Sequence, residues 1–110
     1  MVNIDWSSLG FQYMDTRCHV RYVWRDGKWS DGEEVSEPYL NMHIAASCLH
    51  YGQEAFEGLK AFRCKDGKVR IFRPQANGER LVNSARRTCM APVSVELFVE
   101  AVRRAVRANE

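Results

Sequence analysis

The stretch that decides the fold reads HYGQEAFEGLKAF and occupies residues 50–62. It places aromatic, acidic, histidine and lysine side chains around two glycines, which let the backbone approach a ligand closely. The stretch could therefore line a binding site. The plainer interpretation, which the pattern by itself favours, is a corner between a helix and a strand. In that interpretation Tyr51, Phe56 and Phe62 belong to the hydrophobic core.

Secondary structure can be predicted outward from this stretch. Residues 47–56 are compatible with a short helix that ends at Gly58. Residues 59–64 then read as a strand, Asp66-Gly67 as a turn and residues 69–72 as the partner strand. Asp-Gly tolerates the positive φ angles that a tight hairpin turn requires, so the pattern predicts an antiparallel hairpin.

A second hairpin is predicted closer to the N-terminus. Residues 20–25 alternate in side-chain character with a period of two, as a half-buried strand does. Asp26-Gly27 supplies the turn, and Lys28 and Trp29 begin the return strand. Two Asp-Gly hairpins predict an antiparallel sheet.

The last third of the chain predicts helices. Pro74 suits a first helical turn, Pro92 is expected to break that helix, and Ser94 can cap the next one. The apolar residues of both helices recur at helical spacing; they are Leu81, Ala85, Thr88 and Cys89 in the first helix and Val95, Phe98, Val99, Val102 and Val106 in the second. The predicted fold is α+β, an antiparallel sheet of two Asp-Gly hairpins with the C-terminal helices packed on it.

Length and composition set limits on the kind of protein. A chain of 110 residues with 45% hydrophobic content suits one domain, residues 1–110. No apolar run is long enough to span a membrane, and the polar stretch from Met1 to Leu9 does not resemble a secretory signal. The net charge of +2 is spread over mixed charges, so we expect neither a membrane nor a nucleic acid as partner.

The cysteines suggest neither a metal site nor disulfides. Cys18, Cys48, Cys64 and Cys89 are widely spaced, whereas zinc sites usually contain close ligand pairs. Free thiols in a reducing compartment are the simplest interpretation, so we expect a cytoplasmic protein without a metal ion.

Residues 70–80 form the second candidate site. The guanidinium of Arg80 could bind a phosphate or carboxylate through two donors in one plane, and a nearby helix start adds free N–H groups. Alternatively, Arg80 is an ordinary surface residue that pairs with a nearby acid, which the pattern alone favours. The sequence has no nucleophile-elbow, dinucleotide-binding or P-loop motif.

Taken together, the motifs resemble a known signature. His50-Tyr51-Gly52 followed by Phe56 to Phe62, and Arg73-Pro74 followed by Asn77 and Arg80-Leu81, resemble branched-chain amino-acid aminotransferases. The resemblance implies a fold-type IV enzyme that uses pyridoxal phosphate. Such enzymes have a small N-terminal and a larger C-terminal domain with the cofactor between them, and they form homo-oligomers.

The resemblance also implies roles for individual residues. Members of this family exchange amino groups between leucine, isoleucine or valine and 2-oxoglutarate. Arg80 matches the arginine that binds the cofactor phosphate, and Tyr51 and Phe56 match aromatic residues that contact the substrate side chain. Tyr51 is expected to reach the site of a neighbouring subunit. Lys60 matches a lysine near the pocket, which is not the lysine that binds the cofactor covalently.

The resemblance places that catalytic lysine in the large domain, which we expect to be absent from this chain. None of Lys28, Lys60, Lys65 and Lys68 matches its position, so we assign no catalytic residue. We expect the chain alone to be inactive and to bind the cofactor weakly or not at all. The alternatives are the small domain of another fold-type IV enzyme (a D-amino-acid aminotransferase or aminodeoxychorismate lyase) and a non-catalytic dimerisation or binding module.

Overall fold

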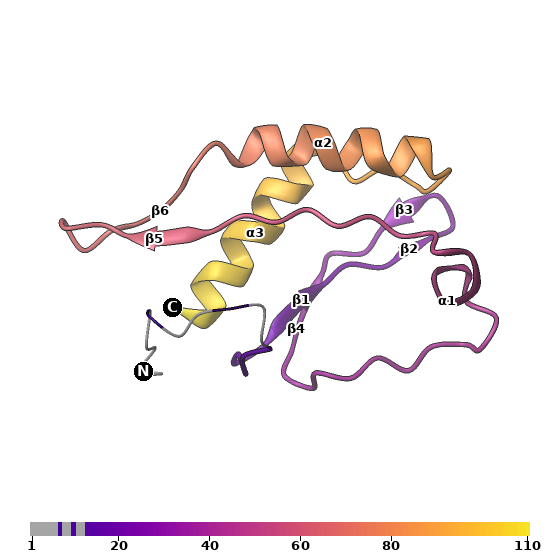
Figure 1. Ribbon diagram of the computed structural model, residues 1–110, viewed down its shortest axis with the longest axis horizontal. Coiled ribbons are helices and arrows are strands. Elements are labelled where there is room, and N and C mark those ends of the chain that lie inside the picture. Colours follow the sequence, from indigo (N-terminus) through magenta and orange to yellow (C-terminus); the bar gives the residue numbers. More distant parts are fainter. Residues whose placement is uncertain (1–6, 8–9, 11–12) are drawn as a thin grey trace.

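The computed structural model describes residues 7, 10 and 13–110, and Figure 1 shows their arrangement. The prediction that residues 1–9 form no secretory signal therefore falls almost entirely outside the described residues. The helices are α1 (Ser47–Tyr51), α2 (Pro74–Arg87) and α3 (Val95–Asn109). The strands are β1 (His19–Arg21), β2 (Trp24–Arg25), β3 (Lys28–Trp29), β4 (Glu33–Val35), β5 (Ala61–Arg63) and β6 (Val69–Ile71).

The described strands form three separate antiparallel pairs, β1–β4, β2–β3 and β5–β6, where the sequence predicted one sheet. The first two pairs are parts of one long hairpin whose return strand has one extra residue. Arg21 pairs with Glu33, and Trp24 pairs with Trp29. The two residues between Arg21 and Trp24 therefore lie opposite the three residues between Trp29 and Glu33. This β-bulge interrupts the ladder. Because of the bulge, the strand predicted over residues 20–25 divides into β1 and β2.

Gly32 makes the bulge possible. Its φ angle is +78°, in the left-handed region that glycine adopts at no steric cost. A Cβ atom at this position would lie 2.5 Å from the ring of Tyr22, so a side chain here would collide with the opposite strand.

Helix α1 is shorter than predicted. It ends at Tyr51, because Gly52 adopts a left-handed conformation with φ of +59° and closes the helix. The prediction that the helix continues to Phe56 and ends at Gly58 is therefore wrong. Residues 52–60 instead run in an extended conformation alongside α2 (Figure 1).

The two long helices begin as the sequence predicted. Pro74 occupies the first turn of α2, and the Ser94 hydroxyl accepts a hydrogen bond from the Leu97 N–H at the start of α3, at 3.1 Å. Helix α2 ends at Arg87, before the predicted break at Pro92, because Cys89 adopts a left-handed conformation.

The core lies where α2, α3 and the residue preceding β1 meet. Ala85, Phe98, Val99 and Ala108 are buried there together with Cys18. Gly78 lets the helices approach closely, since a Cβ atom on it would lie 3.1 Å from the Phe98 ring. Asn109 fixes the end of α3 to the segment just before β1, because its side-chain amide donates to the Cys18 carbonyl oxygen at 2.9 Å.

The expectation that Tyr51, Phe56 and Phe62 belong to the core is wrong. Their side chains are 86%, 92% and 56% exposed, respectively. The helices pack on each other and near β1, which leaves these rings without a covering element among the described residues. Within the same residues, no helix combines the length and the apolar character needed to cross a bilayer.

Candidate functional site

The two sequence motifs meet at the carboxylate of Glu57. Arg80 donates to it from both Nε (3.1 Å, to Oε2) and Nη2 (2.5 Å, to Oε1). The Asn77 side-chain amide donates to Oε1 at 2.7 Å and to the Gly58 carbonyl oxygen at 3.0 Å. We refer to Glu57, Asn77 and Arg80 as the carboxylate junction.

Helix α2 and the extended segment of residues 52–60 position the junction. Asn77 and Arg80 lie three residues apart on α2, so their side chains project from the same face of the helix. The segment is held against α2 at its other end by Gln53, whose amide donates to the Thr88 carbonyl oxygen at 2.8 Å. Contacts near both ends therefore fix the segment along the helix.

Burial and charge distinguish the junction from an ordinary surface pair. The Glu57 side chain is 12% exposed, whereas the Arg80 side chain is 61% exposed, and Asn77 is buried. Hydrogen bonding from Arg80 lowers the pKa of Glu57, against the opposing effect of desolvation. The same hydrogen bond raises the pKa of Arg80. The pair stays ionised near neutral pH and fixes the plane of the guanidinium.

Arg80 keeps hydrogen-bonding capacity beyond Glu57. A guanidinium has five N–H donors, and Glu57 accepts from Nε and Nη2. Arg80 also lines an open groove of about 530 Å³ together with Asn83, Ser84, Arg86 and Arg87. Three cations and two neutral polar side chains suit an anion, and a phosphate is the kind of group that arginine donors bind well. The residues present therefore fit the phosphate of the implied cofactor.

The structure does not bring the other predicted site residues into this groove. Tyr51 is the last residue of α1, and Phe56 immediately precedes the junction. Both rings are exposed, and neither lines the groove of Arg80. Lys60 is also exposed. Among the predicted residues, only Arg80 thus sits within a network of hydrogen bonds and charges.

Sequence reasoning missed the roles of Glu57 and Asn77. It anticipated an acid near Arg80, but it did not identify Glu57 as that acid. The spacing of Asn77 and Arg80 was a usable signal, because residues three apart on a helix share a face. No comparable local pattern links Glu57 to Arg80, since 23 residues separate them.

The junction predicts how acid affects stability. The depressed pKa of Glu57 means that the pair stabilises the fold above the ordinary pKa of 4.5 and loses this contribution as the pH falls below it. We expect Glu57→Gln to lower the free energy of unfolding above pH 4.5 and to differ progressively less from wild type at lower pH. Urea unfolding at a series of pH values measures this, with Glu54→Gln, an exposed acid in the same segment, as the matched control. A difference independent of pH would refute it.

The cysteines and the two neighbouring tryptophans among the described residues offer little chemistry. The four cysteines are free thiols, and no group of three His, Cys, Asp or Glu side chains within residues 7, 10 and 13–110 could hold a metal ion. The rings of Trp24 and Trp29 are tilted by 58° to each other, with their centroids 5.3 Å apart. They line an open cavity of about 570 Å³ near the C-terminal end of α2.

Comparison with known proteins relates the whole chain to aminotransferases. No family model matches the chain. It is 47% identical to the branched-chain-amino-acid aminotransferase of Haemophilus influenzae over 100% of its own length and 32% of that protein. It is 44% identical to the Helicobacter pylori protein of the same name, over 98% of the chain and 32% of the relative. It is also 42% identical to branched-chain-amino-acid aminotransferase 5, chloroplastic, from Arabidopsis thaliana, over 100% of the chain and 27% of that relative.

The length of the match is as informative as its identity. The chain spans about a third of the length of the Haemophilus and Helicobacter relatives. The aligned part includes both motifs and the carboxylate junction, because the match to the Haemophilus protein covers all 110 residues. Over its whole length, the chain is therefore homologous to part of the branched-chain-amino-acid aminotransferases.

Proposed function

We propose that the chain is the small N-terminal domain of a branched-chain amino-acid aminotransferase and forms one wall of its active site. The reaction is the exchange of amino groups between leucine, isoleucine or valine and 2-oxoglutarate. The observation that carries the proposal is the carboxylate junction. It joins the two motifs of the family signature and holds one exposed guanidinium in a fixed orientation.

Arg80 is the residue that would hold the phosphate of pyridoxal phosphate. The bound cofactor supplies an electron sink for the negative charge that develops on the substrate. Glu57 acts through Arg80, because its carboxylate fixes the guanidinium before the phosphate arrives. Asn77 acts one step further away, because its amide donates to the Glu57 carboxylate. A donor already held in place loses less conformational entropy when it binds its ligand.

Tyr51 and Phe56 supply apolar surface for the substrate side chain. Both rings are exposed in the isolated chain, so they are available to a substrate or to a second subunit. An apolar wall discriminates branched side chains by about 1–3 kcal/mol per methylene. This explains why aromatic residues suit the role.

The remaining catalytic parts come from outside this chain in our proposal. The lysine that binds the cofactor belongs to a second, larger domain. The relatives, about three times as long as the chain, have room for such a domain. We further propose that the protein is cytoplasmic and forms a homo-oligomer in which Tyr51 contributes to the site of a neighbouring subunit.

A chimaera tests the function directly. The chain replaces the matching third of the Haemophilus influenzae enzyme, and transfer of the amino group from leucine to 2-oxoglutarate is followed. We expect the chimaera to be active. We expect Arg80→Gln to weaken cofactor binding by about 10- to 100-fold, because a charge-assisted hydrogen bond contributes roughly 1.5–3 kcal/mol.

Arg25→Gln is the matched control in the chimaera, because Arg25 is an exposed arginine at the first hairpin turn, outside the groove of Arg80. Cofactor affinity is measured by fluorescence titration. A folded chimaera without activity would contradict the proposed function. Equal cofactor affinity in Arg80→Gln and Arg25→Gln would contradict the role of Arg80.

A further inference from the structure

A second groove, which does not include Arg80, lies between β6, the start of α2 and α3. Its volume is about 820 Å³, within the range of roughly 300–1,000 Å³ typical of small-molecule sites. Its apolar lining comes from Val69, Ile71, Pro74 and Val106. Its cationic lining comes from Lys68, Arg70, Arg73, Arg103 and Arg107.

Most of these cations lack a carboxylate partner. Arg70 is neutralised by Asp66, to which it donates twice, at 2.8 and 2.7 Å. Glu110 also lines the groove, but it pairs with Arg63 at 3.1 Å. Within the part of the chain that the structure describes, no ion pair engages the remaining four cations. These four are Lys68, Arg73, Arg103 and Arg107, and we call them the cationic groove.

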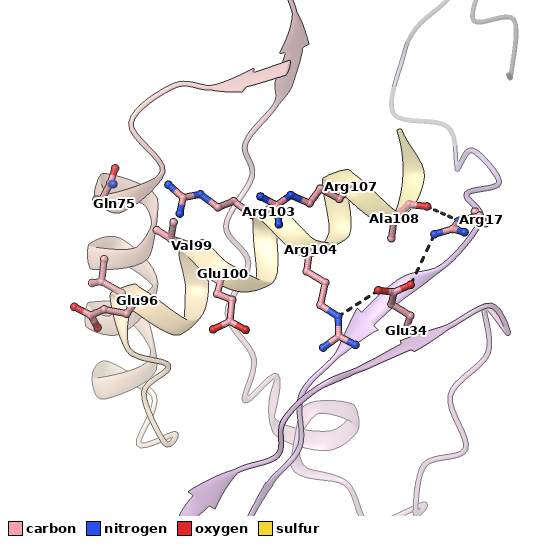
Figure 2. Close-up of a pocket in the computed structure, with 11 residues that line it drawn as sticks. Arg17, Glu34, Gln75, Glu96, Val99, Glu100, Arg103, Arg104, Arg107 and Ala108 are labelled. Atoms are coloured by element: carbon pink, nitrogen blue, oxygen red, sulfur yellow. Dashed lines mark hydrogen bonds and ion pairs between the residues drawn. The ribbon is translucent and has the colours of Figure 1, made fainter. Parts of the chain in front are cut away.

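Two of the three arginines of α3, Arg103 and Arg107, lie on the same side of the helix. Figure 2 shows Arg103 and Arg107 extending along one side of α3 toward Gln75, whereas Arg104 points the other way, toward Glu34. Like charges one helical turn apart repel each other. Arg73 adds a third guanidinium at the start of α2, held in a left-handed conformation with φ of +46°, which is unusual for a residue with a side chain.

The charge pattern elsewhere on α3 shows that this clustering is local. Arg104 donates to Glu34 at 3.3 Å, and Glu34 also lies 3.7 Å from Arg17. Arg104 on that side of the helix thus has a carboxylate partner within the chain, which it shares with Arg17 (Figure 2). The cationic groove has no such compensation, so a bound anion would relieve its repulsion.

We propose that the cationic groove binds a small organic molecule that carries a diphosphate group. A diphosphate concentrates several negative charges on adjacent phosphorus atoms, which matches four uncompensated cations better than a single carboxylate does. Guanidinium groups bind phosphate oxygens through paired donors. The apolar lining accommodates the organic part of the ligand. A nucleic acid fits less well, because it requires a longer basic surface than one groove of this size.

Calorimetric titration of the whole chain with inorganic pyrophosphate tests the proposal. We expect saturable binding that the double substitution Arg103→Gln, Arg107→Gln weakens by about tenfold or more, because two charge-assisted contacts are lost. Glutamine retains good helix propensity, and circular dichroism checks that α3 persists. The matched control is Arg25→Gln, Lys28→Gln, which removes two charges from the first hairpin, outside the groove, and should leave binding unchanged.

Two further measurements distinguish this site from the proposed phosphate contact of Arg80. Arg80→Gln removes any separate pyrophosphate contact in the groove of Arg80, and it should leave in place the binding event that the double substitution on α3 weakens. If Arg80→Gln abolishes binding while the double substitution on α3 does not, the anion binds at Arg80 and the cationic groove is refuted. Glutarate should bind at least about tenfold more weakly than pyrophosphate, because its charges are fewer and more dispersed. Equal or tighter glutarate binding would overturn the assignment to a diphosphate.

Discussion

The chain by itself is expected to produce no glutamate from leucine and 2-oxoglutarate above the rate of free pyridoxal phosphate. A nucleophilic lysine normally needs a desolvated pocket or a neighbouring cation to become reactive. Lys28, Lys60, Lys65 and Lys68 are all exposed, so none of them is desolvated. Proton transfer by a positioned side chain contributes about 10²–10⁴-fold to a rate. The rate of glutamate formation by the chain alone should be lower than that of the active chimaera by at least that factor.

A coupled assay for glutamate measures this difference, with the chimaera and the free cofactor run in parallel. Lys60→Gln is the informative variant, because Lys60 is the one lysine within the motif of residues 50–62. This substitution should not change the rate of glutamate formation measured for the chain alone. Turnover by the wild-type chain that disappears in Lys60→Gln would show that the catalytic lysine is present after all.

Self-association is the second large effect that we expect. The segment of residues 39–56 exposes large apolar side chains: Tyr39, Leu40, Met42, Ile44, Leu49, Tyr51 and Phe56. Several exposed apolar side chains along one segment favour an interface, because burial of apolar surface contributes roughly 25 cal/mol per Å². We therefore expect a dimer or larger oligomer at high protein concentration, in line with the proposed homo-oligomer.

Light scattering during size exclusion measures the mass. The double substitution Tyr39→Ser, Ile44→Ser should shift the protein toward the monomer, since these side chains are 80% and 76% exposed and cannot contribute much to the core. Phe72→Ser is the matched control, because Phe72 is 78% exposed and lies outside the segment. A wild-type chain that remains monomeric at high concentration, or equal effects of both substitutions, would count against this interface.

The sequence by itself determined the features that depend on neighbouring residues. Pro74 and Ser94 marked the starts of α2 and α3, because a fixed φ angle and a capping hydroxyl act within one turn. The family resemblance also rested on short motifs, and relatives that match the whole chain confirm it. Arg80 was found in this way, from the residues beside it.

Only the tertiary structure decided which residues distant in the sequence contact these residues. Arg80 could be identified as a candidate, but its pairing with Glu57, 23 residues away, depends on how the extended segment lies along α2. The exposure of Tyr51 and Phe56 likewise could not be predicted, because an aromatic pattern does not reveal whether another element covers it. Local conformation follows from neighbouring side chains, whereas burial and charge pairing follow from packing between distant segments. The motif of residues 50–62 therefore revealed the family, and the packing of Glu57 and Asn77 against Arg80 gave it a defined geometry.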